Sequence, residues 1–525
     1  MKTGIIFFIA LALGFQSFSQ PKPTRKMPHP LNQPFYNSFA PYISFDGNSI
    51  LFLNDYTDDG NLALYYSKRT GADWAQPALL PKNFNSKVNY IKGFALNPDG
   101  QSLYLTSILS MGMGGYDICL STLKGTEFST PLSVGLPINS KQHDGSPSLS
   151  ADGSVLYFMR CETMNSAQAD RCKLWMSKKQ PGGKWGEPQE LPAYINTGNS
   201  QTPRIMADGE TLIFSSNKLQ PNKGGMDLYL TRWDGQTWSS PVPLDFVNTP
   251  ADDQFVSATS QGQYLLRDAK GERKNELTEF LFPLDLKPKG ILRVDGKLES
   301  PVISAYITVT DMTANKRIYN ARPNADGSFT LYLREGSRYE VAIDPENASA
   351  TFTSRFFDLS SGIGRPFERY NASIKEATAG DEISLSSVRF KPYTNELEES
   401  SSSELRRLSR LLKSKPDLKA EVQVMLQGYR SDSLQSDPDL TEVTIDSVEY
   451  YMDEIDSLGQ LYQRDTLIAE YTYHNDRTLK QAQAVIDQLV ALGCDRTGLV
   501  SFVNARAEAI LEERKIIVKV VLRKR

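Results

Sequence analysis

Two pairs of polar residues in the N-terminal half of this 525-residue chain are candidates for hydrolytic chemistry. They are His143-Asp144 and Asp252-Asp253. Histidine and carboxylates are the residue types that general acid–base catalysis by a glycosidase or peptidase uses. Neither pair follows a visible repeat. Asp144 lies close to a recurring turn phrase, however, so a turn residue is the favoured interpretation and the sequence favours a protein that is not an enzyme.

Composition narrows the function classes. The net charge of −4 argues against a general nucleic-acid binder, because neutralising phosphates requires an excess of Lys and Arg. The three histidines, His29, His143 and His474, are too few and too dispersed for a histidine-based metal site. The spacing of the four cysteines suggests no zinc site either. We therefore expect no metal and no cofactor.

A phrase repeated about every 53 residues is the most regular feature of the chain. It reads Pro-x-apolar-Ser-x-Asp-Gly and leads into a run of alternating apolar residues. Its glycines are Gly47, Gly100, Gly153, Gly209 and Gly262, with gaps of 53, 53, 56 and 53 residues. A fixed period of this size indicates stacked copies of one supersecondary unit. Since each copy contains three or four short strands, we predict a five-bladed all-β propeller in which the repeated Asp and Trp residues are structural.

The fifth copy lacks the outer strand with which the other copies end. Residues 30–37 resemble the corresponding text at residues 243–248, so we expect the N-terminal segment to complete the last blade and close the ring. Residues 28–283 resemble the TolB-type, WD-like repeats of bacterial envelope propellers. That resemblance implies the architecture but no ligand.

The N-terminus and the cysteines indicate export. Residues 1–19 combine Lys2, a short apolar core and a small-x-small cleavage site, which is typical of a secretory signal. No later stretch reaches the roughly 18 apolar residues of a spanning helix. We expect a periplasmic protein associated with the outer membrane. Cys161 and Cys172 flank a hairpin-like loop and are either a disulfide or two buried thiols.

Two further modules follow the repeats. Short alternating strands over residues 288–375 predict a small β-sandwich, which resembles the carboxypeptidase regulatory-like domain. Residues 380–525 alternate strand and helix signals and predict an α+β sandwich of two helices on a small sheet. This order is similar to the OmpA-like C-terminal domain, a family that binds peptidoglycan.

The OmpA-like resemblance implies a binding site for the peptide stem of the cell wall. Asp432 is the acid nearest to the aspartate of the family, one position late, and it follows Tyr429 and Arg430. Gln481, beside Lys480, stands where the family has an arginine. Glutamine cannot supply the charged, two-pronged donor that binds a carboxylate. The resemblance therefore implies a degenerate site.

An acidic insertion covers residues 431–473, between the second strand and the second helix of this domain. A solvated loop is the favoured interpretation, and a docking flap for a basic partner is the alternative. The complete order resembles the PorE-type envelope proteins of type IX secretion and gliding systems. It implies a scaffold between a secretion-system protein and peptidoglycan; in the alternative, the OmpA-like domain only docks proteins.

Overall fold

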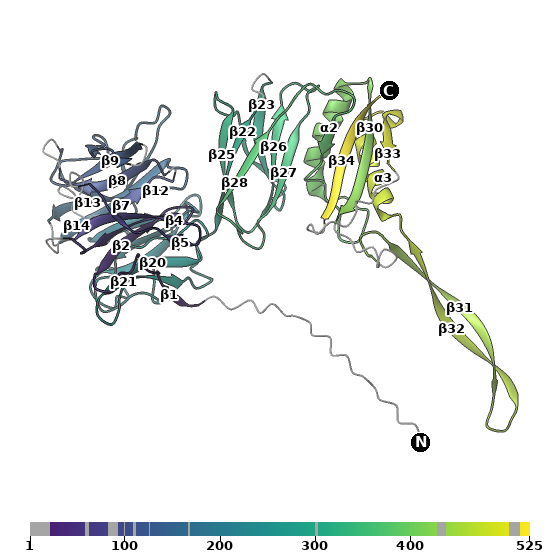
Figure 1. Cartoon of the computed structure of the whole chain (residues 1–525), viewed down its shortest axis with the longest axis horizontal. Helices are drawn as coiled ribbons and strands as arrows, with labels where there is room; N and C mark the ends of the chain where they lie inside the picture. The colour runs from purple at the N-terminus through teal and green to yellow at the C-terminus, as the bar shows by residue number, and fades with distance from the viewer. Residues whose placement is uncertain are drawn as a thin grey trace. The chain divides into compact units, whose positions relative to one another are not determined.

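The computed structural model describes residues 22–57, 62–81, 93–98, 100–108, 112–124, 127–165, 168–299, 303–427, 437–502 and 515–525. The chain divides into two compact units, residues 1–291 and 292–525, which are considered separately (Figure 1). The expected export signal, residues 1–19, lies outside the described residues. No described helix is long and apolar enough to cross a membrane.

The N-terminal unit has a propeller-like architecture, with five antiparallel sheets among its described residues (Figure 1). Sheet I contains β2 (Ser38–Ile43), β3 (Ser49–Asn54), β4 (Ala63–Thr70), β5 (Asp73–Trp74) and β6 (Ala78–Leu79). Sheet II contains β7 (Phe94–Leu96), β8 (Ser102–Ser107), β9 (Asp117–Lys124), β10 (Glu127–Phe128) and β11 (Leu132–Ser133). Sheet III contains β12 (His143–Leu149), β13 (Val155–Met164), β14 (Ala169–Lys178) and β15 (Gln189–Glu190). Sheet IV contains β16 (Ser200–Ile205), β17 (Thr211–Ser216), β18 (Asp227–Arg232) and β19 (Val242–Pro243). Sheet V contains β20 (Tyr264–Lys270), β21 (Asn275–Leu281) and β1 (Thr24–Lys26).

The repeated Asp-Gly phrase forms the turn that precedes the second strand of a sheet. In sheet III the Gly153 N–H donates to the Ser150 carbonyl at 2.8 Å, and Asp152 accepts hydrogen bonds from the Ser150 hydroxyl and the Ser154 N–H. The five glycines of the phrase have φ between 61° and 73°, a region that glycine enters without steric cost. Here the repeated aspartate stabilises a turn.

Apolar side chains are buried between neighbouring sheets. Leu51 of sheet I and Leu103 of sheet II belong to one such cluster, and similar clusters lie between sheets II and III, III and IV, and IV and V. Phe52 of sheet I shares a further cluster with Leu266 and Leu277 of sheet V. The last sheet of the unit is therefore packed against the first.

The N-terminal strand completes sheet V. β1 pairs antiparallel with β21, so that Thr24 lies opposite Phe280. The prediction that residues 30–37 form this strand is wrong in position, because the strand lies at Thr24–Lys26 and the following residues form turns. Pro30 and Pro34 in that segment lack the N–H that strand pairing uses.

A side-chain amide ties the outer end of a sheet to its third strand. In three sheets an asparagine accepts a hydrogen bond from the N–H of one strand residue and donates to the carbonyl of that same residue. The pairs are Asn139 with Ile118, Asn196 with Leu174, and Asn248 with Leu228. Asn32 makes the same two bonds with Leu277, at 2.8 and 2.9 Å. We call this arrangement the amide clamp. In sheet V it comes from the N-terminal segment.

The C-terminal unit begins with a β-sandwich, as predicted. One sheet has the order β25 (Ser328–Arg334), β22 (Ile291–Leu298) and β28 (Phe367–Ala372). The other has the order β24 (Lys316–Ala321), β23 (Ala305–Asp311), β26 (Arg338–Pro345) and β27 (Thr353–Asp358). The inward-facing residues of both sheets form one hydrophobic cluster.

Two helices and a small sheet follow. The sheet has the order β29 (Glu382–Ser384), β34 (Lys515–Lys524), β30 (Leu418–Gln427) and β33 (Leu499–Ser501). Helix α2 (Ser402–Ser414) buries Leu405 and Leu408 in the same core as Val485 and Leu489 of helix α3 (Arg477–Ala491). α2 ends two residues before Pro416, and proline is not tolerated in a helix interior. The α+β arrangement of two helices and a small sheet is therefore present.

Buried charges connect the sandwich to this α+β part, which the sequence treats as separate domains. Arg407 of α2 forms an ion pair with Glu340 of β26. Glu404, one turn earlier, accepts hydrogen bonds from the Ser387 N–H at 2.7 Å and from the Ser354 hydroxyl. Burial and the neighbouring Glu340 carboxylate raise the pKa of Glu404 to about 7, although Arg407 acts in the opposite direction.

The amide clamp of Asn32 predicts a measurable loss of stability. Asn32→Ala leaves the N–H and carbonyl of Leu277 without these partners, so we expect the free energy of unfolding of the N-terminal unit to fall by about 2 kcal/mol. All five tryptophans lie in this unit, so urea unfolding followed by tryptophan fluorescence isolates its transition. Asn248→Ala is the matched control and should cost as much. If Asn248→Ala destabilised the unit while Asn32→Ala did not, the N-terminal segment would not belong to the fold.

The raised pKa of Glu404 predicts a pH dependence of the C-terminal unit. The folded state holds a proton that the unfolded state releases near pH 4.5, so stability falls as the pH rises from 4.5 to 7, by on the order of 3 kcal/mol. Calorimetry detects the unfolding of both units. The transition of the C-terminal unit is the one that tryptophan fluorescence does not report, because all tryptophans lie in the N-terminal unit. Glu404→Gln should flatten the profile between these pH values, and an unchanged slope in that variant would contradict the assignment.

Candidate functional site

A long two-stranded hairpin is the most unusual surface of the C-terminal unit. β31 (Glu442–Ile455) and β32 (Leu461–His474) pair in continuous antiparallel register, from Glu442 opposite His474 to Ile455 opposite Leu461. Among the described strands they pair only with each other, and the hairpin extends away from the sheet of its own unit (Figure 1). The favoured interpretation of this insertion as a solvated loop is therefore wrong.

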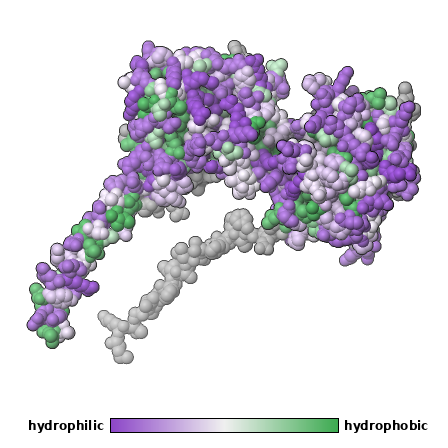
Figure 2. Space-filling view, turned by 180° about the vertical axis from the view of Figure 1, so that it is seen from behind, coloured by the Kyte–Doolittle hydropathy of each residue, from purple (hydrophilic) through white to green (hydrophobic). Residues whose placement is uncertain are grey.

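One face of the hairpin carries more large apolar side chains than the other, which has Val448, Tyr450, Met452, Tyr462 and Ile468. Because directly opposed residues of an antiparallel pair share a face, the register places eight large apolar side chains on the same side. We call this the apolar face: Val443, Ile445, Tyr451, Ile455, Leu461, Leu467, Tyr471 and Tyr473. Their exposed fractions run from 43% to 69%, and apolar colour recurs along the hairpin in Figure 2. The acids Glu449, Asp453 and Asp465 lie between them on the same face. Exposed apolar side chains gathered on one face mark interaction sites in soluble proteins.

The hairpin is strongly acidic as well. Between residues 442 and 474 there is a single basic side chain other than histidine, Arg464, against eight acids. The acids are Glu442, Asp446, Glu449, Asp453, Glu454, Asp456, Asp465 and Glu470. The charge and the apolar face together favour a positively charged partner with apolar side chains of its own.

Polar contacts fix the base of the hairpin to helix α3. The Thr441 hydroxyl donates to the side chain of Asn475, and the Arg477 guanidinium donates to the Thr441 carbonyl at 3.0 Å. Lys480 of α3 lies 2.6 Å from Glu442 and 3.3 Å from Asp476. The two strands therefore leave the domain at a defined point.

The structure does not assemble the residues expected to bind peptidoglycan. Tyr429, Arg430 and Asp432 lie outside the described residues. Lys480 forms ion pairs at the base of the hairpin, whereas the adjacent Gln481 is buried and donates to the Thr394 carbonyl at 2.8 Å. These two neighbours thus face different surroundings.

The two candidate pairs of the N-terminal unit, His143-Asp144 and Asp252-Asp253, occupy equivalent positions in two repeats. His143 Nδ1 accepts a hydrogen bond from the Tyr116 N–H at 3.2 Å, and Asp252 accepts one from the Met226 N–H at 2.8 Å. In each case the next residue, Asp144 or Asp253, donates its N–H to the carbonyl of that same residue, which directly precedes β9 or β18. The interpretation of these pairs as unpatterned is wrong.

The second residue of each pair is an aspartate that contacts both an arginine and a loop. Asp144 lies 2.6 Å from Arg160, and Asp253 lies 2.7 Å from Arg267. Asp144 also accepts hydrogen bonds from both the N–H and the hydroxyl of Ser140. These carboxylates connect loops to strands. Among the described residues no cluster of His, Cys, Asp and Glu could hold a metal ion.

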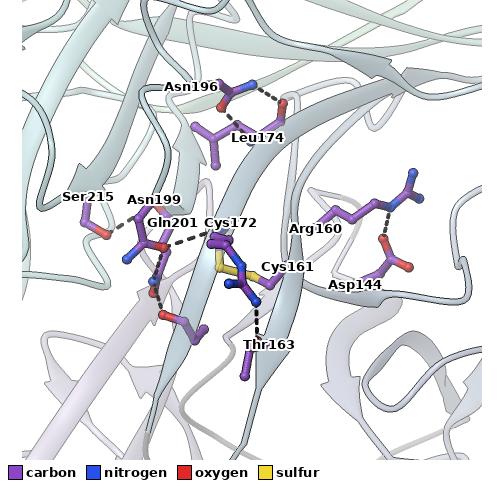
Figure 3. Close-up of a disulfide and its surroundings, with 12 residues drawn as sticks. Asp144, Arg160, Cys161, Thr163, Cys172, Leu174, Asn196, Asn199, Gln201 and Ser215 are labelled. Atoms are coloured by element: carbon purple, nitrogen blue, oxygen red, sulfur yellow. Dashed lines mark hydrogen bonds and ion pairs between the residues drawn. A yellow bond between two sulfur atoms is a disulfide. The ribbon is translucent and has the colours of Figure 1, made fainter.

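A disulfide joins Cys161 of β13 to Cys172 of β14 (Figure 3). The two residues are directly opposed in the strand register, which brings their Cα atoms to 4.0 Å. Asn199 Oδ1 accepts a hydrogen bond from the Cys172 N–H. Arg160, which directly precedes Cys161, extends its side chain to the ion pair with Asp144 (Figure 3). Cys119 and Cys494 are buried free thiols, and burial raises the pKa of Cys119 to about 12.

The hairpin was the feature that sequence reasoning missed, although the signal was present. β-branched and aromatic residues are abundant in both strands, and Gly459 adopts a positive φ of 83° in the connecting turn. The acidic composition of the insertion favoured a solvated loop and led to the wrong prediction.

Comparison with known proteins gives weak likenesses only. No family model and no curated protein sequence matches the chain. Among solved structures, TolB from Agrobacterium tumefaciens is 15% identical, with 57% of this chain and 90% of that chain covered and a TM-score of 0.29. A glycoside hydrolase is 11% identical, with 49% and 90% covered and a TM-score of 0.32. An oligogalacturonate lyase in complex with manganese is 15% identical, with 63% and 78% covered and a TM-score of 0.27. At these TM-scores the likenesses carry no argument, so the fold is described from the strand pairing of this chain.

The disulfide should contribute to the stability of the N-terminal unit. Cys161 and Cys172 are 11 residues apart, and releasing a loop of this size costs about 3 kcal/mol on the chain-entropy account. We expect the double variant Cys161→Ala, Cys172→Ala to lose about that much in urea unfolding followed by tryptophan fluorescence. Dithiothreitol should destabilise the wild-type chain but not the double variant. Equal sensitivity of the two proteins to the reductant would contradict this role.

Proposed function

We propose that this chain is a non-enzymatic scaffold of the cell envelope, exported to the periplasm, that binds a basic protein through the hairpin of β31 and β32. The apolar face of the hairpin is the observation that carries this proposal. An isolated two-stranded hairpin is at best marginally stable in water. A partner that covers the apolar face removes its side chains from water and stabilises the hairpin at the same time.

The charge of the hairpin selects the class of partner. Eight acids against one arginine repel a second acidic hairpin, so a second copy of this chain is a poor partner for the surface. A basic protein is attracted to the acids of the hairpin at long range, and at contact it buries the apolar face. Both outer edges of the hairpin also have backbone groups available for strand addition, a common mode of peptide recognition.

The rest of the chain fits the role of a support. We infer that the five sheets are the blades of a closed ring, which the N-terminal strand completes. His143, Asp144, Asp252 and Asp253, the residues with the chemistry of a hydrolase, are occupied by contacts that hold loops. The order of propeller, sandwich and OmpA-like domain supports a scaffold of the PorE type in a secretion or gliding system.

Contact with the cell wall is the second candidate. It rests on the resemblance of residues 380–525 to the OmpA-like family. Lys480 and Gln481 give it little support, because one forms ion pairs with hairpin-base residues and the other is buried. Docking of a protein is therefore the function that the geometry of the described residues favours.

Site-specific crosslinking on the two faces of the hairpin tests the proposal. Tyr451 belongs to the apolar face, whereas the adjacent Tyr450 points to the opposite face; they are 62% and 48% exposed. With a photoreactive residue at position 451 of the full chain in the native envelope, we expect one major adduct, identified by mass spectrometry as a basic protein. Position 450 is the matched control and should give at most about a tenth of that adduct. Ile445→Ser should reduce the adduct at 451 at least about tenfold without changing the calorimetric transition.

Other outcomes discriminate between the alternatives. Equal adducts from positions 450 and 451, or an adduct with a second copy of this chain, would contradict docking of a basic partner on the apolar face. Retention of the full chain on purified peptidoglycan that is lost in Asp432→Ala would instead support contact with the wall.

A further inference from the structure

A small cavity in the N-terminal unit is lined by Arg204, which has no acidic partner among the described residues. The cavity measures about 40 Å³. Its lining draws on sheets I, III, IV and V and includes Tyr42, Ser148, Arg204, Ser257 and Ser260. Phe45, Ala151 and Ala207 also line it, and each directly precedes the aspartate of an Asp-Gly turn. The cavity therefore lies at the turn-bearing ends of the sheets.

The guanidinium of Arg204 is held in place by backbone carbonyls and a ring. Its Nε donates to the Val256 carbonyl at 3.0 Å and its Nη2 to the Phe94 carbonyl at 3.3 Å. The guanidinium carbon lies 4.5 Å from the centre of the Tyr42 ring, whose hydroxyl donates to the Leu96 carbonyl. Contacts from sheets I, II and V thus fix a side chain that belongs to sheet IV.

These contacts leave part of the guanidinium unpaired. Nη1 of Arg204 is buried and has no hydrogen-bond partner among the described residues. Two other arginines of this unit with little exposed surface, Arg160 and Arg267, each have an aspartate within 2.7 Å. Arg204 has no such ion pair in the described part of the chain. Burial accordingly lowers the pKa of Arg204 to about 10, against its ordinary value of 12.5.

Hydroxyl groups surround the same space. The Oγ of Ser260 is buried and, like Nη1 of Arg204, has no hydrogen-bond partner in the described residues. Ser148 Oγ accepts a hydrogen bond from the Ile205 N–H at 3.0 Å, and as a hydroxyl it keeps a hydrogen to donate. A buried donor without a partner is costly, and a buried charge without one is more so.

We propose that this cavity binds a carboxylate group, with Nη1 of Arg204 and the Ser260 hydroxyl as its donors. The space of about 40 Å³ that the cavity offers to water-sized groups is small, which suits a carboxylate group. The planar guanidinium is the side chain best suited to a carboxylate. The group is supplied by a free monocarboxylate or by the end of a polypeptide that enters between the turns.

Thermal unfolding of the full chain, followed by tryptophan fluorescence, tests this site. Sodium formate and sodium acetate serve as probes, with the ionic strength held constant by a sulfonate buffer anion too bulky for the cavity. A saturable rise in the unfolding temperature of the N-terminal unit by at least about 2 °C is expected. A tripeptide with a free C-terminal carboxylate, compared with its amidated form, distinguishes a polypeptide end from a free anion: an effect of the free form alone supports the former source.

Three variants decide whether the effect belongs to the cavity. Ser260→Ala should leave the unfolding temperature without ligand within about 1 °C of the wild type and weaken the apparent affinity at least about threefold. Arg204→Met should abolish the effect, and if that variant does not fold, Ser260→Ala still tests the site. Arg273→Met removes an exposed arginine of the same unit, in the turn between β20 and β21, and should leave the response to the carboxylates unchanged. No saturable rise in the wild type, an unaltered response in Ser260→Ala, or an equal loss in Arg273→Met would mean that the cavity holds only water.

Discussion

The amide clamp is the constraint on which the N-terminal unit depends. A blade-like sheet ends in a very short outer strand, which offers few backbone hydrogen bonds of its own. The clamp adds two hydrogen bonds to one residue of the third strand and fixes its position along the chain. Because Asn32 supplies the clamp for Leu277, residues almost 250 positions apart in the sequence are bound in the same way as neighbours elsewhere. The hydrophobic cluster shared by sheets I and V then fills the space where the first and the last sheet meet.

The C-terminal unit is held together by a different kind of interaction. Its sandwich and its α+β part share Arg407, Glu340 and Glu404, all of them buried. Buried charges of this kind contribute little net stability, but removing one partner is strongly unfavourable. The network therefore specifies how the two parts fit more than it strengthens either of them. The sandwich and the α+β part, expected as separate modules, belong to one compact unit.

Sequence reasoning was most successful where a pattern repeats. The Asp-Gly phrase predicted the turns because glycine at positive φ is a local requirement, and the alternating strand and helix signals of residues 380–525 predicted the α+β part. The N-terminal strand was predicted at the wrong residues because residues 30–37 were compared with residues 243–248 through their prolines. The structurally equivalent feature is an apolar residue followed by asparagine, as in Leu31-Asn32 and Val247-Asn248. That pair was visible in the sequence.

Other features had no local signal. Glu404 and Arg407 look like charges on the exposed face of a helix, and only the packing of the sandwich against α2 buries them. Arg204 is one of 58 basic residues, and its isolation depends on which strands of other sheets approach it. The residues expected to bind peptidoglycan are the opposite case, since the family resemblance implied a binding role for Gln481, which is buried.

The length of the hairpin has a consequence for recognition at its tip. Fourteen residues in each strand, at about 3.3 Å per residue, give a reach of roughly 45 Å from the base. Salt screens exposed charges beyond about 8 Å at physiological ionic strength. A molecule approaching the tip is thus insensitive to the electrostatic potential of the globular domain. Its attraction to the tip depends only on the acids of the hairpin itself.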